Sequence, residues 1–137
     1  MPKGGLARVK NPLPTQDTGL HTNPEQWLQD NHWEPAAEVT VAAIGVGGQQ
    51  DLGAAVAGGE VRRIRELTMR NDGSNNTVVT LLVSGGATKL TTDVPAKTTR
   101  VWSSPDGRSF AAGQVSAVQT SDVTGGSTYV SASGVEE

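Results

Sequence analysis

The chain has 137 residues and no cysteine, so a disulfide framework and a thiolate metal site are both excluded. Aromatic side chains are scarce at 4%, and hydrophobic residues reach only 35%. This composition leaves enough Val, Leu and Ala for one thin core but not for a large one. We therefore expect a single domain, or one domain with an arm.

Long hydrophobic runs and an excess of positive charge are also missing. No stretch approaches the ~20 apolar residues of a membrane span, and no apolar run near Met1 resembles a signal peptide. With 11 basic and 14 acidic side chains the net charge is −3, so the whole chain offers no field for a polyanion. The sequence predicts a soluble protein used without secretion, with neither a membrane nor a nucleic acid as its partner.

Segments rich in Ala, Leu, Glu and Lys, which helices favour, are absent, whereas Gly, Thr, Ser and Val abound in short runs between turns. This pattern is typical of all-β proteins. About eight such runs, with a turn roughly every ten residues, predict a β-sandwich or jelly-roll-like domain over residues 37–137.

Residues 1–36 differ from the rest, because they hold five of the seven prolines and show no hydrophobic period. Such proline spacing favours an extended path, so we expect an extended N-terminal arm. One short helix is predicted near residues 24–30, where Asn23 or Thr22 can cap it and Pro24 suits its first position.

The arm carries two of the three tryptophans, and large aromatics are unusual in an idle tail. Two interpretations remain open: the rings close the end of their own sandwich, or the arm docks on a neighbouring subunit. About 35 extended residues could reach on the order of 100 Å. The candidate contact residues of the arm are Leu20, Trp27, Leu28 and Trp33.

Residues 60–85 are expected to form the centre of the domain, as two long strands joined into a hairpin by the turn at 71–76. In the second strand Val79 and Leu81 point to one face, and Val78 and Leu82 to the other. A strand that is apolar on both faces is central in its sheet, or is half core and half contact surface.

The first of these two strands has an irregular spacing. Val61, Ile64 and Leu67 are three residues apart, whereas Leu67 and Met69 are two apart, which favours a strand with a bulge near Arg65. Farther along, the Pro-Asp-Gly sequence at 105–107 is a strong turn signal. It predicts a hairpin in which residues 97–103 pair with residues 109–111.

Four arginines form the only charge cluster, at positions 62, 63, 65 and 70. No aromatics are interleaved with them, which argues against a groove for nucleic acid. Arginines on a strand face pair with nearby carboxylates or with those of a neighbouring subunit. We therefore add Arg62, Arg63 and Arg65 to the candidate interface residues.

Residues with the pattern of a catalytic or metal site are not found. His21 and His32 lie near Asp17, Asp30 and Glu34 in sequence, but the spacing fits no known ligand pattern. No nucleophile elbow or phosphate-binding loop is present, and the aspartates at turns are expected to bond to their own backbone. We expect no enzyme, no cofactor and no metal.

A proline-rich arm followed by a small Thr/Val/Gly sandwich resembles the minor structural proteins of tailed-phage virions. The resemblance covers residues 38–137, and residues 67–74 and 95–102 are similar in style to such chains. It implies a capsid decoration (cement) protein in the virion, assembled in the host cytoplasm, with the major capsid protein as its partner. It also implies a homo-oligomer, for which a trimer is favoured.

Two alternatives stay open. A tail, head–tail connector or fibre-base subunit of the virion would share the same features. A carbohydrate- or receptor-binding module is a different class, since small jelly rolls bind sugars and Trp102 and Tyr129 could stack on a pyranose ring. The low aromatic content argues against this second alternative.

Overall fold

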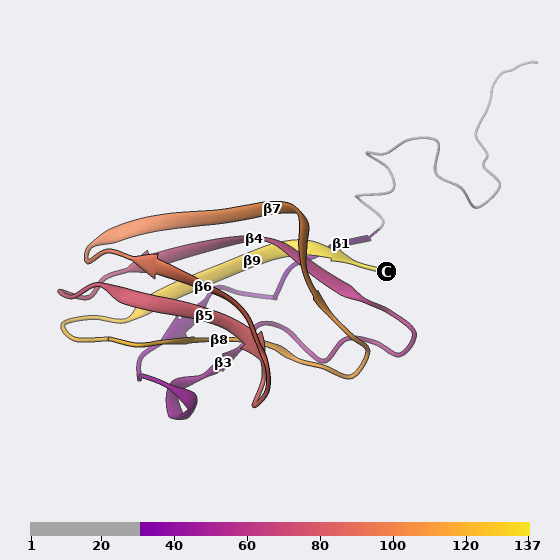
Figure 1. Cartoon of the computed structure of the whole chain (residues 1–137), viewed down its shortest axis with the longest axis horizontal. Coiled ribbons are helices and arrows are strands. Elements are labelled where there is room, and N and C mark those ends of the chain that lie inside the picture. The colour runs from indigo at the N-terminus through magenta and orange to yellow at the C-terminus, as the bar shows by residue number, and fades with distance from the viewer. Residues whose placement is uncertain (1–30) are drawn as a thin grey trace, which may run out of the picture. The chain divides into compact units, whose positions relative to one another are not determined.

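The computed structural model describes residues 31–137 and shows an almost entirely β structure (Figure 1). This confirms the all-β fold expected from composition. The predicted helix near residues 24–30 lies outside the described residues. Within them the elements are β1 (His32–Trp33), β2 (Val39–Val41), the 3-10 helix η1 (Val46–Gly48), β3 (Gln50–Asp51), β4 (Arg62–Asn71), β5 (Thr77–Val83), β6 (Thr88–Val94), β7 (Thr98–Phe110), β8 (Ser116–Thr120) and β9 (Thr128–Glu136).

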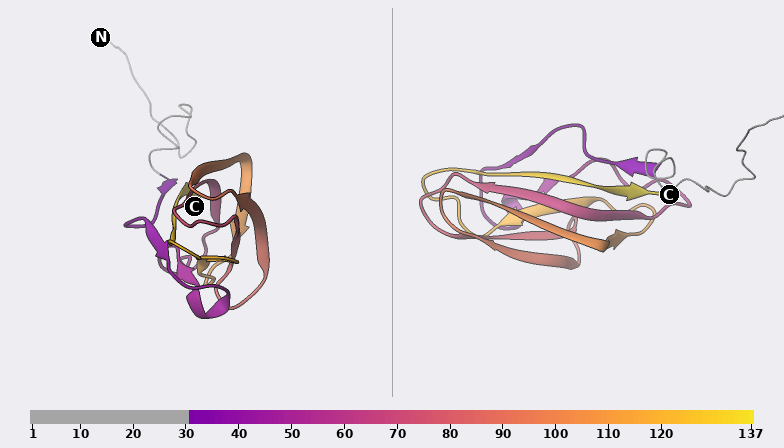
Figure 2. Two further views of the ribbon diagram at one scale, coloured as in Figure 1. Left: turned by 90° about the vertical axis from the view of Figure 1, so that its left-hand side faces the viewer. Right: turned by 90° about the horizontal axis from the view of Figure 1, so that it is seen from above.

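The strands form two antiparallel sheets that face each other. We call the sheet with order β1-β9-β4-β7 sheet A, in which β2 also pairs with β9, and the sheet with order β3-β8-β5-β6 sheet B. Figure 2 shows both sheets end-on and from above, with β1 and β2 on one side of the sandwich and β6 and β7 on the other. The two sides each consist of one edge of sheet A and one edge of sheet B.

The core lies between the sheets and follows the alternation of strand side chains. In the long central strands every second residue points into it, as Leu67 and Met69 do in β4 and Val79 and Leu81 do in β5. Phe110 at the end of β7 is its largest apolar side chain and is fully buried. The core also contains Val41, Leu52, Val56, Ile64, Val94, Val118, Val130 and Ala132.

The predicted bulge in β4 is present. Ile64 pairs with Gly134 of β9, whereas Glu66 pairs with Ser133, so Arg65 has no opposite residue. The extra residue explains the mixed spacing of apolar residues, because it allows Ile64 and Leu67, which are three residues apart, to point to the same face of the strand.

The predicted hairpin between residues 60 and 85 is wrong, because β4 and β5 belong to different sheets. The loop at 72–76 carries the chain from one sheet to the other. The side chain of Asn71, which is fully buried, fixes this crossing. Its Nδ2 donates to the carbonyl oxygens of Asn75 at 2.8 Å and Val94 at 3.0 Å, and its Oδ1 accepts from the Gly73 N–H at 2.8 Å. Nevertheless β5 is central in its sheet, as expected, with β6 and β8 as neighbours.

The hairpin predicted around Pro-Asp-Gly is also wrong, since both of its halves belong to the single strand β7. Residues 98–103 and 108–110 all pair with β4, and residues 104–107 form an excursion opposite the bulge. Gly107 has a φ of 69°, so glycine does take the left-handed position that the sequence predicted. A Cβ there would lie 2.8 Å from the carbonyl oxygen of Ile64, which explains why the excursion can lie so close to β4.

Two regions near the amino-terminal side of the sandwich also differ from expectation. Two of the roughly eight short runs expected to form strands, residues 38–44 and 49–57, shrink to β2 and β3, and residues 52–61 form a loop that buries Leu52 and Val56. In contrast, His32 and Trp33 were assigned to the arm, yet they pair with Val135 and Gly134 of β9. Sheet A therefore begins before the expected domain boundary at residue 37.

Candidate interaction surfaces

The first candidate site is the arm root, the name we give to His32 and Trp33 of β1, which directly follow the first 31 residues. β1 attaches to β9, and the ring of Trp33, which is half-buried, packs against the core. The guanidinium carbon of Arg62 lies 4.3 Å from the centroid of this ring, a cation–π contact. Trp33 also lies against Gly53, where a Cβ would come within 3.1 Å of the ring. The tryptophan therefore lies on its own sandwich, which is the first of the two interpretations left open by the sequence.

Arg62 was expected on an exposed interface, but its side chain is only 2% exposed. Its Nε donates to Oε1 of Glu136 at 2.8 Å, and Nη1 and Nη2 reach Oγ of Ser116 at 2.9 Å and the Ala54 carbonyl oxygen at 2.8 Å. A charge buried in this way is tolerable only because a counter-ion and several acceptors surround it. Arg62 therefore connects the loop after β3 to β4, β8 and β9, and an external partner cannot reach it.

The other predicted interface residues are spread over the molecule. Arg63 is exposed on β4, and Arg65 is half-buried at the bulge, where its Nε has no hydrogen-bond partner within the described part of the chain. Among the predicted interface residues that the structure describes, Trp33 and Arg62 are brought into contact with each other. The remaining predicted contact residues, Leu20, Trp27 and Leu28, lie outside the described residues.

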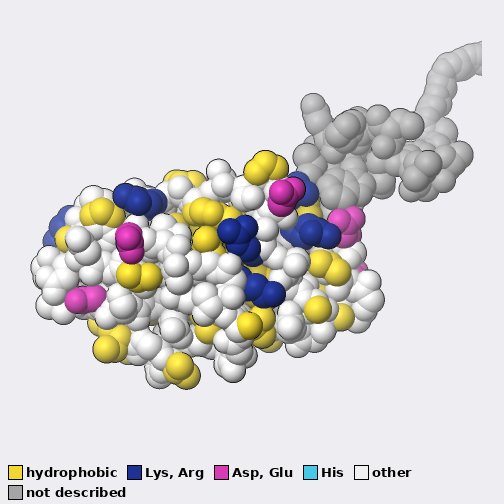
Figure 3. All heavy atoms as spheres, in the orientation of Figure 1, with side chains coloured by type: hydrophobic (Ala, Val, Ile, Leu, Met, Phe, Trp, Pro, Cys, Tyr) yellow, Lys and Arg dark blue, Asp and Glu magenta, His cyan; other side chains and the backbone are white. Residues whose placement is uncertain are grey.

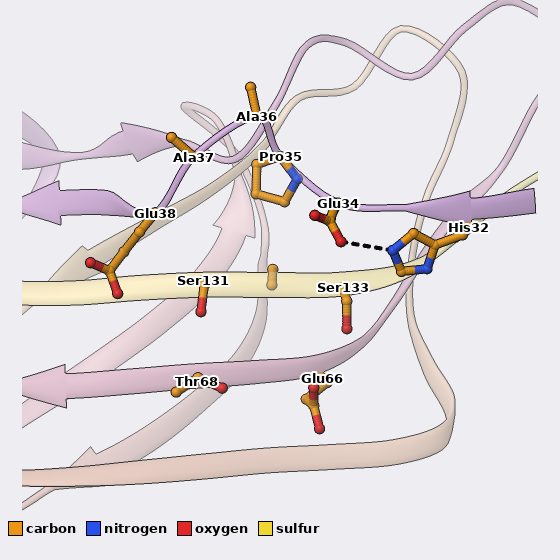
Figure 4. Close-up of a pocket in the computed structure, with 11 residues that line it drawn as sticks. His32, Glu34, Pro35, Ala36, Ala37, Glu38, Glu66, Thr68, Ser131 and Ser133 are labelled. Atoms are coloured by element: carbon orange, nitrogen blue, oxygen red, sulfur yellow. Dashed lines mark hydrogen bonds and ion pairs between the residues drawn. The ribbon is translucent and has the colours of Figure 1, made fainter. Parts of the chain in front are cut away.

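A groove with a volume of about 450 Å³ lies between residues 34–38 and the outer face of sheet A. Figure 4 shows the carboxylates of Glu34 and Glu38 on one side of it and that of Glu66 on the other, with the hydroxyls of Ser131 and Ser133 on β9 between them. Oε2 of Glu34 is 2.8 Å from Nε2 of His32, which is exposed. The groove can accept hydrogen bonds and positive charge. No three His, Cys, Asp or Glu residues among 31–137 are grouped closely enough to hold a metal ion.

Two exposed apolar side chains in the link between β2 and β3, Ile44 and Val46, make up what we call the apolar patch. Ile44 and Val46 are 58% and 75% exposed, and shallow hollows of about 330 and 280 Å³ lie beside Ile44, between Val123 and Val78. Val78 is half-buried on the face of β5 that points away from the core. Leu82, expected on the same face, is only 5% exposed, so of the second apolar face expected for this strand Val78 is the part that belongs to this candidate contact surface.

The turns at the end of the sandwich opposite β1 hold their polar groups in local bonds. The Thr124 N–H donates to Oδ1 of Asp122 at 2.8 Å, and Asn75 donates to its Oδ2 at 3.3 Å. These bonds, the Thr124 backbone contact first, hold the pKa of Asp122 below its ordinary value. The expectation that this turn aspartate bonds to the backbone is confirmed, and its role there is structural.

Both aromatic residues considered for sugar binding are covered on one ring face by arginine. The guanidinium carbon of Arg108 lies 5.1 Å from the ring centroid of Trp102, and that of Arg70 lies 4.2 Å from the ring centroid of Tyr129. Trp102 in addition packs against the core. A pyranose ring would have to displace these arginines to stack on the covered faces.

Sequence reasoning did not find the groove beside residues 34–38. Its glutamates come from two distant segments, the link between β1 and β2 and the bulged part of β4, and no local pattern joins them. One signal was nevertheless available, since no Lys or Arg occurs between Lys10 and Arg62. Such a long stretch without positive charge indicates an acidic surface wherever it folds.

Comparisons with known proteins identify no relative: no protein-family model, curated protein or solved structure matches the chain. Within residues 31–137 there is also no helix long and apolar enough to cross a lipid bilayer.

Proposed function

We propose that this chain is a structural subunit of a tailed-phage virion, a decoration protein that stabilises the head by binding neighbouring capsid subunits. The observation that supports this proposal best is the firm attachment of the arm root to the body. Trp33 packs on the core, and the Arg62 under its ring is bonded to three other segments. A subunit that holds its neighbours through an arm needs a firmly attached arm root, because any force on the arm is transmitted to the body at that point.

The body offers surfaces that neighbours could complete. The apolar patch at Ile44 and Val46 is exposed, and so is Val101 on β7, at 56%. Exposed apolar side chains that cluster beside hollows are typical of protein contact sites. The outer strand β7 pairs only with β4 within the described residues, so its other edge carries unpaired backbone groups. Such a subunit acts through buried area, at roughly 800 Å² for each partner.

Localisation on purified particles tests this function. Virions of the phage that encodes the chain are separated on a density gradient and labelled with an antibody raised against residues 31–137. We expect label on the outer surface of the head, in many copies. Label confined to the tail, the connector or the fibre base would instead favour the first alternative. Particles without the chain would overturn the virion assignment altogether.

The binding of carbohydrate is the other alternative, and a glycan array distinguishes it. We expect no glycan to bind the isolated protein, because Arg108 and Arg70 lie over the rings of Trp102 and Tyr129. Specific binding to one glycan that is lost in Trp102→Ala, while the protein stays folded, would favour the carbohydrate-binding class.

A further inference from the structure

Charge is distributed unequally between the two sides of the sandwich. Residues 32–60, which contain β1, β2 and β3, carry four carboxylates and neither Lys nor Arg. Residues 88–110, which form β6 and β7 and the link between them, carry four Lys and Arg side chains against two aspartates. Because β1, β2 and β3 form one side and β6 and β7 the other, the sandwich has an acidic side and a cationic side.

The cationic side is continuous across both sheets. Arg108 on β7 donates from Nε to the carbonyl oxygen of Lys89 on β6 at 3.1 Å, and its guanidinium lies over Trp102. Arg100 is two residues from Trp102 on the same strand and is exposed. Figure 3 shows this side of the molecule, with Lys and Arg side chains beside apolar ones in the middle and carboxylates nearer the margins.

These cations have no carboxylate partners of their own. Within residues 31–137 the ion pairs are His32–Glu34, Arg62–Glu136 and Arg70–Asp72, and none of them involves β6 or β7. The acidic side is similarly unneutralised, since Glu38 and Asp51 are exposed and lack an ion pair in this part of the chain. Two unneutralised sides of opposite charge are complementary to each other.

The strand register aligns residues of the two sides, because a single row of paired residues crosses sheet A from β2 to β7. Val39 of β2 pairs with Val130 of β9, Val130 with Met69 of β4, and Met69 with Arg100 of β7. Arg100 therefore lies on the same row of sheet A as Val39, next to Glu38. Since neighbouring strands are all antiparallel, β7 and β2 also run in opposite directions. Two copies placed side by side in one orientation would bring these edges together as an antiparallel pair.

We propose that copies of this chain associate head to tail, with the cationic side of one copy, centred on Arg100, against the acidic side of the next, centred on Glu38. This inference rests on the proposed function, because it describes how the structural subunit contacts other copies of the same chain. A contact between two different sides is heterologous, so it generates a closed ring where the rotation closes, such as the expected trimer, and a filament where it does not.

Charge complementarity identifies a second copy as the occupant of each side. Opposite charges guide the encounter and fix the register, while like-charged sides repel each other and exclude a symmetric contact between two acidic or two cationic sides. Association must then weaken as salt rises, since exposed charges are screened over about 10 Å at 0.1 M ionic strength.

Sedimentation velocity of the full chain tests the contact. We expect oligomers at about 50 mM NaCl that dissociate at about 500 mM NaCl. Arg100→Glu and Glu38→Arg should each weaken self-association by about tenfold or more, because each places like charges in contact. The double variant with both substitutions exchanges the two charges and should restore self-association, whatever the size of the ring.

Arg63→Glu is the matched control, because it reverses another exposed arginine, on the central strand β4 of sheet A. It should leave self-association unchanged, and circular dichroism should show that all four variants are folded. An equal loss in Arg63→Glu, a double variant as weak as its single parents, or a chain that is monomeric at low salt would overturn the proposal. A monomer that still labels phage heads would overturn the head-to-tail contact alone, whereas an oligomer absent from particles would overturn the decoration function alone.

Discussion

The guanidinium of Arg62 lies under the ring of Trp33, 4.3 Å from its centroid, while its Nε donates to Glu136 at 2.8 Å. One buried cation thus joins the second residue of the first strand to the last strand of the sandwich. The contact binds the arm root to the body, and its neighbour Arg63 provides a matched comparison because it is exposed.

Replacing this cation should destabilise the fold, whereas replacing its neighbour should not. We expect Arg62→Met to lower the free energy of unfolding by about 3 kcal/mol or more, since Glu136 would be left as an unpaired charge near the core. Arg63→Met should stay within about 0.5 kcal/mol of the natural chain. Urea denaturation followed by tryptophan fluorescence measures both. Equal stabilities for the two variants would contradict a structural role for Arg62.

Gly134 should not tolerate any side chain. It lies in β9 opposite the bulge of β4, and a Cβ there would overlap the carbonyl oxygen of Arg63. Because the obstacle is backbone, Gly134→Ala must separate β4 from β9, at a cost of about 2 kcal/mol or more. Gly85→Ala is a useful comparison: that glycine has open space around it, and only its φ of 70° opposes the change. Thermal unfolding should show the larger loss for Gly134→Ala.

The crossing from sheet A to sheet B should depend on the amide of Asn71. Asn71→Asp removes the donor that two carbonyl oxygens use and buries a carboxylate in its place, so we expect a loss of about 3 kcal/mol or more. Asn76→Asp should be nearly neutral, because Oδ1 of Asn76 accepts from the Ala96 N–H and a carboxylate keeps that acceptor. Chemical denaturation at neutral pH compares the pair. A tolerated Asn71→Asp would show that the amide does not fix the crossing.

Asp122 should contribute to the loss of stability in acid. Its folded-state pKa is lowered, so its contribution is fully present above the unfolded pKa of about 3.9 and disappears as pH falls through the folded value. Asp122→Asn should therefore flatten the dependence of stability on pH below about pH 4. The free energies of unfolding of the natural chain and of Asp122→Asn, compared from about pH 6 to about pH 2, test this expectation, and parallel curves for the two proteins would contradict it.

The strands themselves were predictable because their side chains alternate, and the bulge at Arg65 was predictable because Ile64 and Leu67 break that alternation. The pairing of strands was not predictable in the same way. A turn sequence indicates that the chain bends, but not whether the next strand joins the same sheet or the facing one. At the end of β4 that choice depends on Asn71, whose amide reaches Val94, far away in sequence.

The excursion in β7 illustrates the same limit. Pro105 and Gly107 favour a tight turn, and Gly107 does adopt the left-handed conformation. The two flanking halves nevertheless both pair with β4, because the bulge at Arg65 leaves room for the four extra residues. Arg62 was wrongly predicted to be an interface residue for a related reason. Its hydrogen-bond acceptors on Ala54 and Ser116 belong to other elements, and without knowledge of these acceptors a charged side chain is predicted to be exposed.

The position of β9 has a consequence for synthesis. This strand follows all the other described strands along the chain, yet it is the one described strand with which β1 and β2 pair, and β4 pairs with it on its other edge. A nascent chain that has completed eight strands still has no place to attach its earliest two. Whatever a partner recognises on those strands is therefore created only when translation has passed Glu136, so the acidic side can bind a second copy only after β9 has been made.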